Sequence, residues 1–198
     1  FERTYADWLA KPDAVRACRF FLDELYGAKD FRQRDAEFAR VVPTMTRLFP
    51  DELAATIQSL GALHALSETL DHQMATHLRS PVVDAMAYAT AWQATGQPTR
   101  RAEQIKLMHD VGTSLSVYTR RPLLRHTLKI MRKPAAAAGL ASLQSFLEEG
   151  FDAFASLPNA DAFLSAVAAR ETTLCDLLFA LNPADMPKRF AQARADPQ

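Results

Sequence analysis

The segment "DELAATIQSLGALHALSETLDHQMATHL", residues 51–78, indicates the fold class of this chain. Its large apolar residues recur every three or four positions, and this spacing places side chains on one face of an α-helix. The set comprises Leu53, Ile57, Leu60, Leu63, Leu66, Leu70 and Met74. The segment therefore predicts one long helix.

Outward from this segment, proline and glycine mark further helix ends. One helix is predicted from Pro12 to Gly27, and another after an Asp30 cap, to be kinked or ended by Pro43. Pro81 should open the next helix and Gly96 should close it. Four more are predicted over residues 98–119, 122–132, 140–156 and 160–181. No segment alternates as a β-strand does, so we predict an all-α fold.

The expected architecture is a single-domain bundle or orthogonal array of seven to eight helices. This domain should cover residues 1–181, and residues 182–198 should form a loosely attached tail. With 198 residues, 48% of them hydrophobic, the chain can bury a core without disulfides or metal. Cys18 and Cys175 lie far apart and are expected to be small buried apolar residues.

The sequence shows no targeting or membrane-spanning pattern. No apolar run approaches the roughly 18 residues that a transmembrane helix needs, and no signal-peptide pattern opens the chain. We therefore expect a cytoplasmic protein. Because the sequence begins at Phe1, the presence of a leader before it is left open.

The formal net charge is zero, but the charges are unevenly distributed along the chain. Residues 99–133 hold nine Lys or Arg against two acids, whereas residues 134–181 hold six acids against one base. A neutral domain is not typical of a nucleic-acid-binding protein. The simplest interpretation is that oppositely charged helices complement each other within one fold.

Several stretches resemble the FFLEELY-motif proteins, a proteobacterial family. They are "FFLDELYG" (20–27), "DFRQRDAEFARVVP" (30–43), "LKIMRKPAAAAGLASLQSFLEEGFDAF" (128–154) and "FLSAVAARETTLCDLLF" (163–179). The resemblance extends over residues 20–181, and Asp23 stands where the family name has Glu. It implies an α-helical bacterial protein whose biochemical activity is unassigned, so no catalytic residue can be transferred from it.

Motifs of known enzyme classes are missing from the sequence. It has no Walker loop, GxGxxG after a strand, GxSxG or CxxC, so we predict no catalytic residue and rank an enzyme third among the functions. His64, Glu68 and His72 are spaced at i, i+4 and i+8 and could offer two imidazoles and a carboxylate to a metal ion. A solvated helix face with i,i+4 pairing is the favoured interpretation. No metal or cofactor is expected.

A second group of polar residues falls within the apolar arcs of its helices. It comprises His77, Arg101, Gln104, Arg170 and Glu171. Burial of such groups costs several kcal/mol unless they are paired. We therefore expect Arg170 or Glu171 to be substantially buried, and Glu171 to contact a cation, with Arg101 as the best candidate. A satisfied structural network is favoured, and a polar-lined ligand pocket is the alternative.

Residues 121–133 combine a basic stripe with apolar positions. The stripe consists of Arg121, Arg125, Lys129, Arg132 and Lys133, and the opposite side carries Leu123, Leu124, Leu128, Ile130 and Met131. The stripe is expected to be exposed and dispensable for folding. Phosphate backbones, anionic lipids or an acidic partner could bind it. Nucleic acid is not favoured, because no aromatic residues are interleaved with the charges.

Phe20 and Phe21 are adjacent and cannot share one narrow face of a helix. Phe21 belongs to the predicted core face, whereas Phe20 lies opposite among charged residues. We expect Phe20 to be covered by the segment with Tyr5, Trp8 and Leu9, or by a second subunit. The leading functional hypothesis is a non-enzymatic protein that binds a protein partner or itself. The alternative is a small-ligand or cofactor-binding protein with a polar pocket between its helices.

Overall fold

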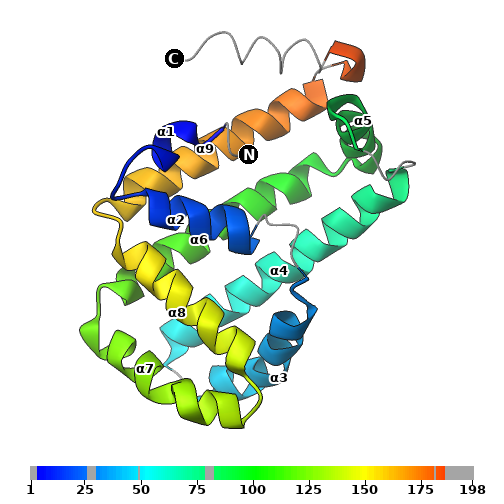
Figure 1. Ribbon diagram of the computed structural model, residues 1–198. Coiled ribbons are helices and arrows are strands. Elements are labelled where there is room, and N and C mark those ends of the chain that lie inside the picture. The colour runs from blue at the N-terminus through cyan, green and yellow to red at the C-terminus, as the bar shows by residue number, and fades with distance from the viewer. Residues whose placement is uncertain (1–3, 26–29, 49, 79–82, 181, 186–198) are drawn as a thin grey trace. The chain divides into compact units, whose positions relative to one another are not determined.

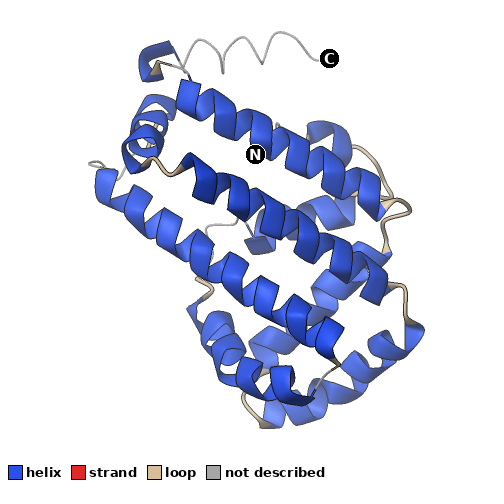
Figure 2. Cartoon of the chain, turned by 180° about the vertical axis from the view of Figure 1, so that it is seen from behind, coloured by secondary structure: helices blue, strands red, loops and turns tan. Residues whose placement is uncertain are grey.

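The structure is a computed structural model that describes residues 4–25, 30–48, 50–78, 83–180 and 182–185. Within these ranges the chain is helical and contains no β-strand, which confirms the all-α prediction (Figure 2). The α-helices are α1 Ala6–Leu9, α2 Val15–Phe20, α3 Arg32–Leu48, α4 Asp51–His77, α5 Ala85–Thr95, α6 Pro98–Thr119, α7 Pro122–Ala137, α8 Ala141–Ala155 and α9 Ala160–Ala180 (Figure 1).

Proline and glycine mark several of the helix ends as predicted. Pro98 opens α6, Pro122 occupies the first turn of α7, and Gly96 ends α5 with a positive φ of 67°. Proline did not mark the helix end in two other places, because α3 continues past Pro43 and α7 continues past Pro134. Of the two outcomes predicted for Pro43, the end of the helix is therefore wrong, and α7 is longer than its predicted range of 122–132.

The start of α5 differs from the prediction. Val83 and Asp84 precede the helix, so α5 begins at Ala85, and Pro81 lies outside the described residues. The side chain of Asp84 accepts a hydrogen bond from the Ala87 backbone N–H at 2.8 Å. An N-terminal cap of this kind satisfies a donor that the helix itself cannot.

The helix predicted from Pro12 is shorter and changes its winding. α2 begins at Val15, and a π-helical turn, Phe21–Leu25, follows it directly. Phe21 is buried and its ring lies 5.8 Å from that of Phe154 and 5.4 Å from that of Phe163. The wider π turn alters the angle between successive side chains, so wheel positions drawn for an α-helix no longer hold here.

Phe20 is half-buried against α8. Its ring centre is 5.5 Å from that of Phe146, and a Cβ at Gly150 would lie only 2.9 Å from its ring. Trp8 packs instead on Phe163, at 5.1 Å. The sequence analysis named the N-terminal segment or a second subunit as the cover of Phe20 and missed α8, which supplies this contact.

The chain divides into two compact units. Unit 1 comprises residues 1–59 and 110–165, and unit 2 comprises residues 60–109 and 166–198. The buried apolar residues of unit 1 include Cys18, Phe21, Leu143, Phe154, Phe163 and Leu164. Those of unit 2 include Leu66, Leu70, Met74, Ala89, Val167 and Cys175. The expectation of one domain over residues 1–181 stays a prediction.

Two further sequence expectations concern the C-terminal segment and the membrane. A 3₁₀ turn at Pro183–Asp185 packs against α5, and residues 186–198 of the predicted tail lie outside the described residues. None of the helices in the described ranges has the length and apolar character needed to cross a bilayer.

In unit 1, α8 packs against α2, α3 and α7 (Figure 1). The turn between α7 and α8 contains Gly139, whose φ of 67° favours glycine. Arg40 of α3 donates to the carbonyl oxygens of Ala138 and Gly139 at 2.9 and 2.6 Å. The carboxylate of Glu37, one turn earlier on α3, accepts from the Leu143 backbone N–H at 2.7 Å. α3 therefore fastens both the turn and the start of α8.

Candidate functional site

The outward side of α7 exposes large apolar residues. Of the seven such side chains exposed among the described residues, Leu123, Ile130 and Met131 belong to α7. Leu123 is 74% exposed and Ile130 is 61% exposed, the two largest values. Residues seven positions apart lie on the same face of a helix. The sequence pattern had placed these three residues on the side of the helix opposite the basic stripe. A packing role was expected for Met131, and this expectation was wrong, because Met131 is exposed.

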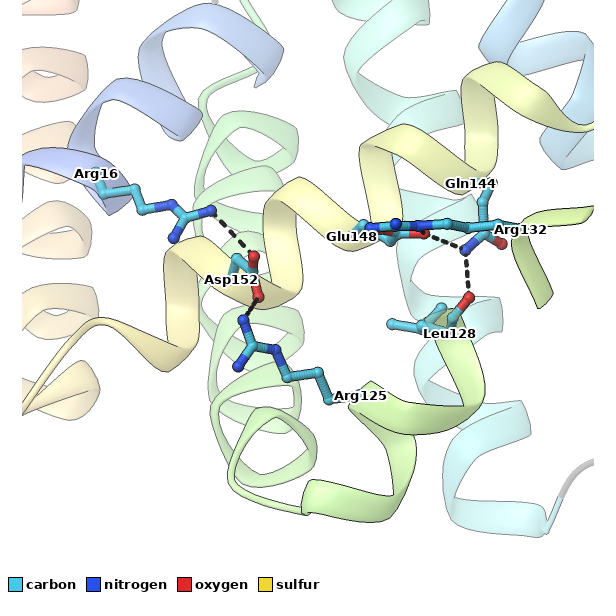
Figure 3. A network of polar contacts seen from close by, with 7 residues as sticks. All are labelled: Arg16, Arg125, Leu128, Arg132, Gln144, Glu148 and Asp152. Carbon is cyan, nitrogen blue, oxygen red and sulfur yellow. Dashed lines mark hydrogen bonds and ion pairs between the residues drawn. The ribbon is translucent and has the colours of Figure 1, made fainter. Parts of the chain in front are cut away.

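The basic stripe of α7, defined as Arg121, Arg125, Lys129, Arg132 and Lys133, is exposed throughout. Two of its members contact α8 (Figure 3). Arg125 Nη2 lies 2.7 Å from Asp152 Oδ1, and Arg132 Nε donates to both carboxylate oxygens of Glu148 at 2.7 and 2.8 Å. These contacts join α7 to α8. The predicted exposure of the stripe is confirmed, and its dispensability for folding stays a prediction.

Asp152 lies between two guanidinium groups. Arg16 of α2 donates to Asp152 Oδ2 at 3.2 Å, while Arg125 approaches the other oxygen from α7 (Figure 3). One carboxylate of α8 thus joins three helices. Surface ion pairs contribute little individually, but a shared carboxylate fixes how the three helices meet.

Gln144 is a buried amide next to the Arg132–Glu148 pair. Its Nε2 donates to the Leu128 carbonyl oxygen at 2.7 Å and to Glu148 Oε1 at 2.8 Å (Figure 3). The hydrogen bond from Arg132, more than that from Gln144, lowers the pKa of Glu148 from its ordinary 4.5 to about 2. Glu148 therefore remains ionised near neutral pH and neutralises part of the basic stripe.

A polar cluster occupies the interior of unit 2. The Arg101 side chain is 6% exposed, and its guanidinium carbon lies 4.1 Å from the centre of the Trp92 ring. Arg101 Nη1 donates to Gln104 Oε1 at 3.1 Å, and Gln104 Nε2 donates to Ser67 Oγ at 2.8 Å. Arg101 and Gln104, singled out from the sequence, are therefore neighbours in the structure.

The carboxylate that forms an ion pair with Arg101 belongs to Asp71, at 3.9 Å. Sequence reasoning had named Glu171 for this role and missed Asp71, because Asp71 does not interrupt an apolar arc of α4. Glu171 nonetheless lies near the cluster, since its charge raises the pKa of Tyr88. The larger cause of that rise in the Tyr88 pKa is burial of the phenol.

The other predicted members of the cluster differ in burial. Arg170 and Glu171 are half-buried, and His77, the last residue of α4, is exposed. His77 falls on the apolar arc of a helical wheel, but its position at the end of α4 leaves it exposed. Its predicted place among buried groups was therefore wrong.

The structure does not support the weak metal alternative. Among the described residues, no three His, Cys, Asp or Glu side chains are grouped so that they could hold a metal ion. His64 is half-buried, whereas Glu68 and His72 are exposed. Helical spacing alone puts such residues on one face, but it does not bring their ligating atoms to one point.

A pocket of about 350 Å³ in unit 1 lies between the start of α4 and the end of α6. Its lining consists of Glu52, Ala55, Thr56, Ser59, Asp110, Val111, Ser114, Val117, Tyr118 and Arg121. Two carboxylates, one guanidinium and several hydroxyls thus meet there. The sequence pattern did not indicate it, because its two walls are far apart along the chain.

Comparison with known proteins gives a family without an assigned activity. DUF8198, a domain of unknown function, matches residues 1–185, a stretch that includes α1 to α9. No curated protein matches the chain, and neither does any solved structure. The chain belongs to the DUF8198 family, a family of domains of unknown function.

Proposed function

We propose that this protein acts by binding a protein partner through the outward face of α7, without catalysing a reaction. The observation that carries the proposal is the exposure of Leu123 and Ile130, at 74% and 61%, on one face of a helix. Exposed apolar side chains that cluster on one element mark interaction surfaces more often than singly scattered ones do.

The spacing of these residues suits a helical partner. Leu123 and Ile130 are separated by two helical turns, and Thr127 lies between them on the same face. A partner helix can place an apolar side chain between such residues, as in other helix-in-groove contacts.

Charge indicates the chemistry of the partner. α7 contains no Asp or Glu, and α8 supplies carboxylates to Arg125 and Arg132. Within the described part of the chain, Lys129 and Lys133 form no ion pair. An amphipathic helix with acidic residues beside its apolar face would complement these lysines. Two copies of α7 placed face to face would instead bring like charges together, which disfavours self-association through this surface.

A protein partner suits this face better than a lipid surface does. α7 has no aromatic residue, whereas helices that lie in a membrane interface commonly carry Trp or Phe on their apolar side. Leu123 and Ile130 form a short apolar row. Nucleic acid is disfavoured as well, because an apolar row beside the lysines would gain nothing from a phosphate backbone.

Site-specific photo-crosslinking would test the proposal. A benzophenone amino acid at Leu123 should, in cells that make the protein naturally, attach to a segment that is both acidic and amphipathic. The same amino acid at Leu177, an exposed apolar residue of α9, is the matched control. Lys129→Glu combined with Lys133→Glu should reduce the yield from position 123. Crosslinks only to lipid, only to a second copy, or to nothing would overturn the proposal.

Two finer expectations belong with this proposal. We place the chain among the proteobacterial FFLEELY-motif proteins on the four matching stretches of its sequence. We also place it in the cytoplasm, supported by Cys18 and Cys175, which are both free and buried.

A further inference from the structure

Two buried N–H groups in unit 2 have no hydrogen-bond acceptor. They are Arg101 Nη2 and Trp92 Nε1, and they are the only such side-chain N or O atoms among the described residues. Both belong to one contact, in which the guanidinium carbon lies 4.1 Å from the centre of the indole ring. An unsatisfied buried donor costs about 1–3 kcal/mol. Two at one place therefore indicate that an acceptor from outside the chain completes the cluster.

The charge of Arg101 is also incompletely balanced. Its side chain is 6% exposed, whereas that of Asp71 is 70% exposed, and their closest N···O distance of 3.9 Å is too long for a hydrogen bond. The hydrogen bond from Nη1 goes to the neutral amide of Gln104. Burial lowers the pKa of Arg101, and this effect outweighs the opposing influence of Asp71 and Tyr88. The guanidinium thus lacks a close negative partner.

We propose that Arg101 Nη2 and Trp92 Nε1 bind a small oxyanion, a free carboxylate or phosphate, in unit 2. Arginine binds such groups through two parallel hydrogen bonds, and their several oxygens can accept from a second donor at the same time. The rings of Tyr88 and Phe179, centred 6.1 and 5.8 Å from that of Trp92, provide apolar walls. A few convergent donors against apolar walls are typical of small-ligand sites.

The size of the ligand follows from the packing. Tyr88, Phe179 and the guanidinium group all contact the Trp92 ring, so little space is left around the two donors. We therefore expect an ion as small as formate, acetate or inorganic phosphate, and not a nucleotide. This site does not involve α7, so the proposal of an oxyanion site goes beyond the proposed protein-binding surface. Either proposal can be correct while the other is wrong.

Tryptophan fluorescence offers a direct test. The chain has two tryptophans, so Trp8→Phe leaves Trp92 as the sole reporter. Sodium acetate and sodium phosphate, titrated separately at constant ionic strength against sodium chloride, should give a saturable change in emission. The two titrations distinguish a carboxylate from a phosphate ligand. In the same background, Arg101→Met should weaken the affinity about tenfold or more.

Arg100→Met is the matched control. Arg100 precedes Arg101 on α6 and donates instead to Gln97 Oε1 at 3.3 Å, so its removal should leave the titration unchanged. The indole N–H resonance of Trp92 in a ¹H–¹⁵N NMR spectrum provides a second readout, which should shift only when Arg101 is present. If neither ion gives a saturable response, or if Arg101→Met responds as the parent does, water satisfies the donors and the proposal is wrong.

Discussion

Two of the buried residues that the structure describes are charged, Glu37 in unit 1 and Arg101 in unit 2. Counting backbone and side chain together, they are 6% and 5% exposed. The Glu37 carboxylate accepts from the Leu143 backbone N–H at 2.7 Å and from Gln33 Nε2 at 3.2 Å. It also faces the first turn of α8, where the helix dipole favours negative charge. Arg101, by contrast, has an aromatic face, a neutral amide and a distant carboxylate.

The difference shows that burial alone does not tell what a charged residue contributes. The residue before α8 is Leu140, whose side chain cannot accept a hydrogen bond, so α8 has no side-chain cap of its own. Glu37 supplies the missing acceptor. The fold therefore depends on Glu37 being charged. Arg101 keeps an N–H group without an acceptor, so the fold gains little from its charge. A role in binding explains its burial better than a role in stability does.

The largest expected effect is that of Glu37→Ala. The substitution leaves the Leu143 N–H buried without an acceptor, so it should lower the free energy of unfolding by about 2–3 kcal/mol. Urea titration followed by circular dichroism would measure this. Glu37→Gln is the control, because it keeps an acceptor oxygen but removes the charge, and it should cost less. Equal losses for the two variants would contradict the assignment of Glu37 as the cap of α8.

Arg101→Met should have a much smaller effect on stability. In buffer without carboxylate or phosphate ions, the free energy of unfolding should change by less than about 1 kcal/mol in either direction. Methionine keeps the contact with Trp92 and removes the unsatisfied N–H, while the largely exposed Asp71 stays solvated. A loss of more than about 2 kcal/mol would show that Arg101 is a structural ion-pair residue like Glu37, and the comparison would fail.

The sequence predicted what depends on local patterns. The extent of α4 and α6 follows from apolar spacing and from Pro98, and Arg101 was noticed because it interrupts an apolar arc. Glu37 was missed, because the backbone N–H that it binds belongs to Leu143, 106 residues away. Such a contact leaves no trace in helical periodicity. No local pattern could have revealed it.

α7 shows a second limit of sequence patterns. Its apolar residues point in more than one direction, and periodicity cannot tell which of them another helix covers. Leu128 is half-buried, whereas Leu123 and Ile130 are exposed. Phe20 was misjudged for a related reason, since the π turn after it and the glycine at position 150 that admits its ring act only in three dimensions.

The smallest expected effect concerns Glu148, a half-buried carboxylate that is hydrogen-bonded as fully as Glu37. Its pKa is lowered from 4.5 to about 2 in the folded protein, chiefly by the hydrogen bond from Arg132. A lowered folded-state pKa stabilises the fold above the unfolded-state pKa, and this contribution is lost as the pH falls toward the folded-state value. Stability should therefore decline between about pH 5 and pH 2 more steeply in the parent protein than in Glu148→Gln. The difference should be small and should shrink in high salt, because Arg132 is largely exposed and water screens the pair.

Thermal melts of the parent protein and of Glu148→Gln across this pH range would measure the difference in stability. Parallel curves of melting temperature against pH would show that the Arg132–Glu148 contact is not maintained in solution. A carboxylate would then have to be as deeply buried as Glu37 before its hydrogen bonds contribute to the stability of the fold.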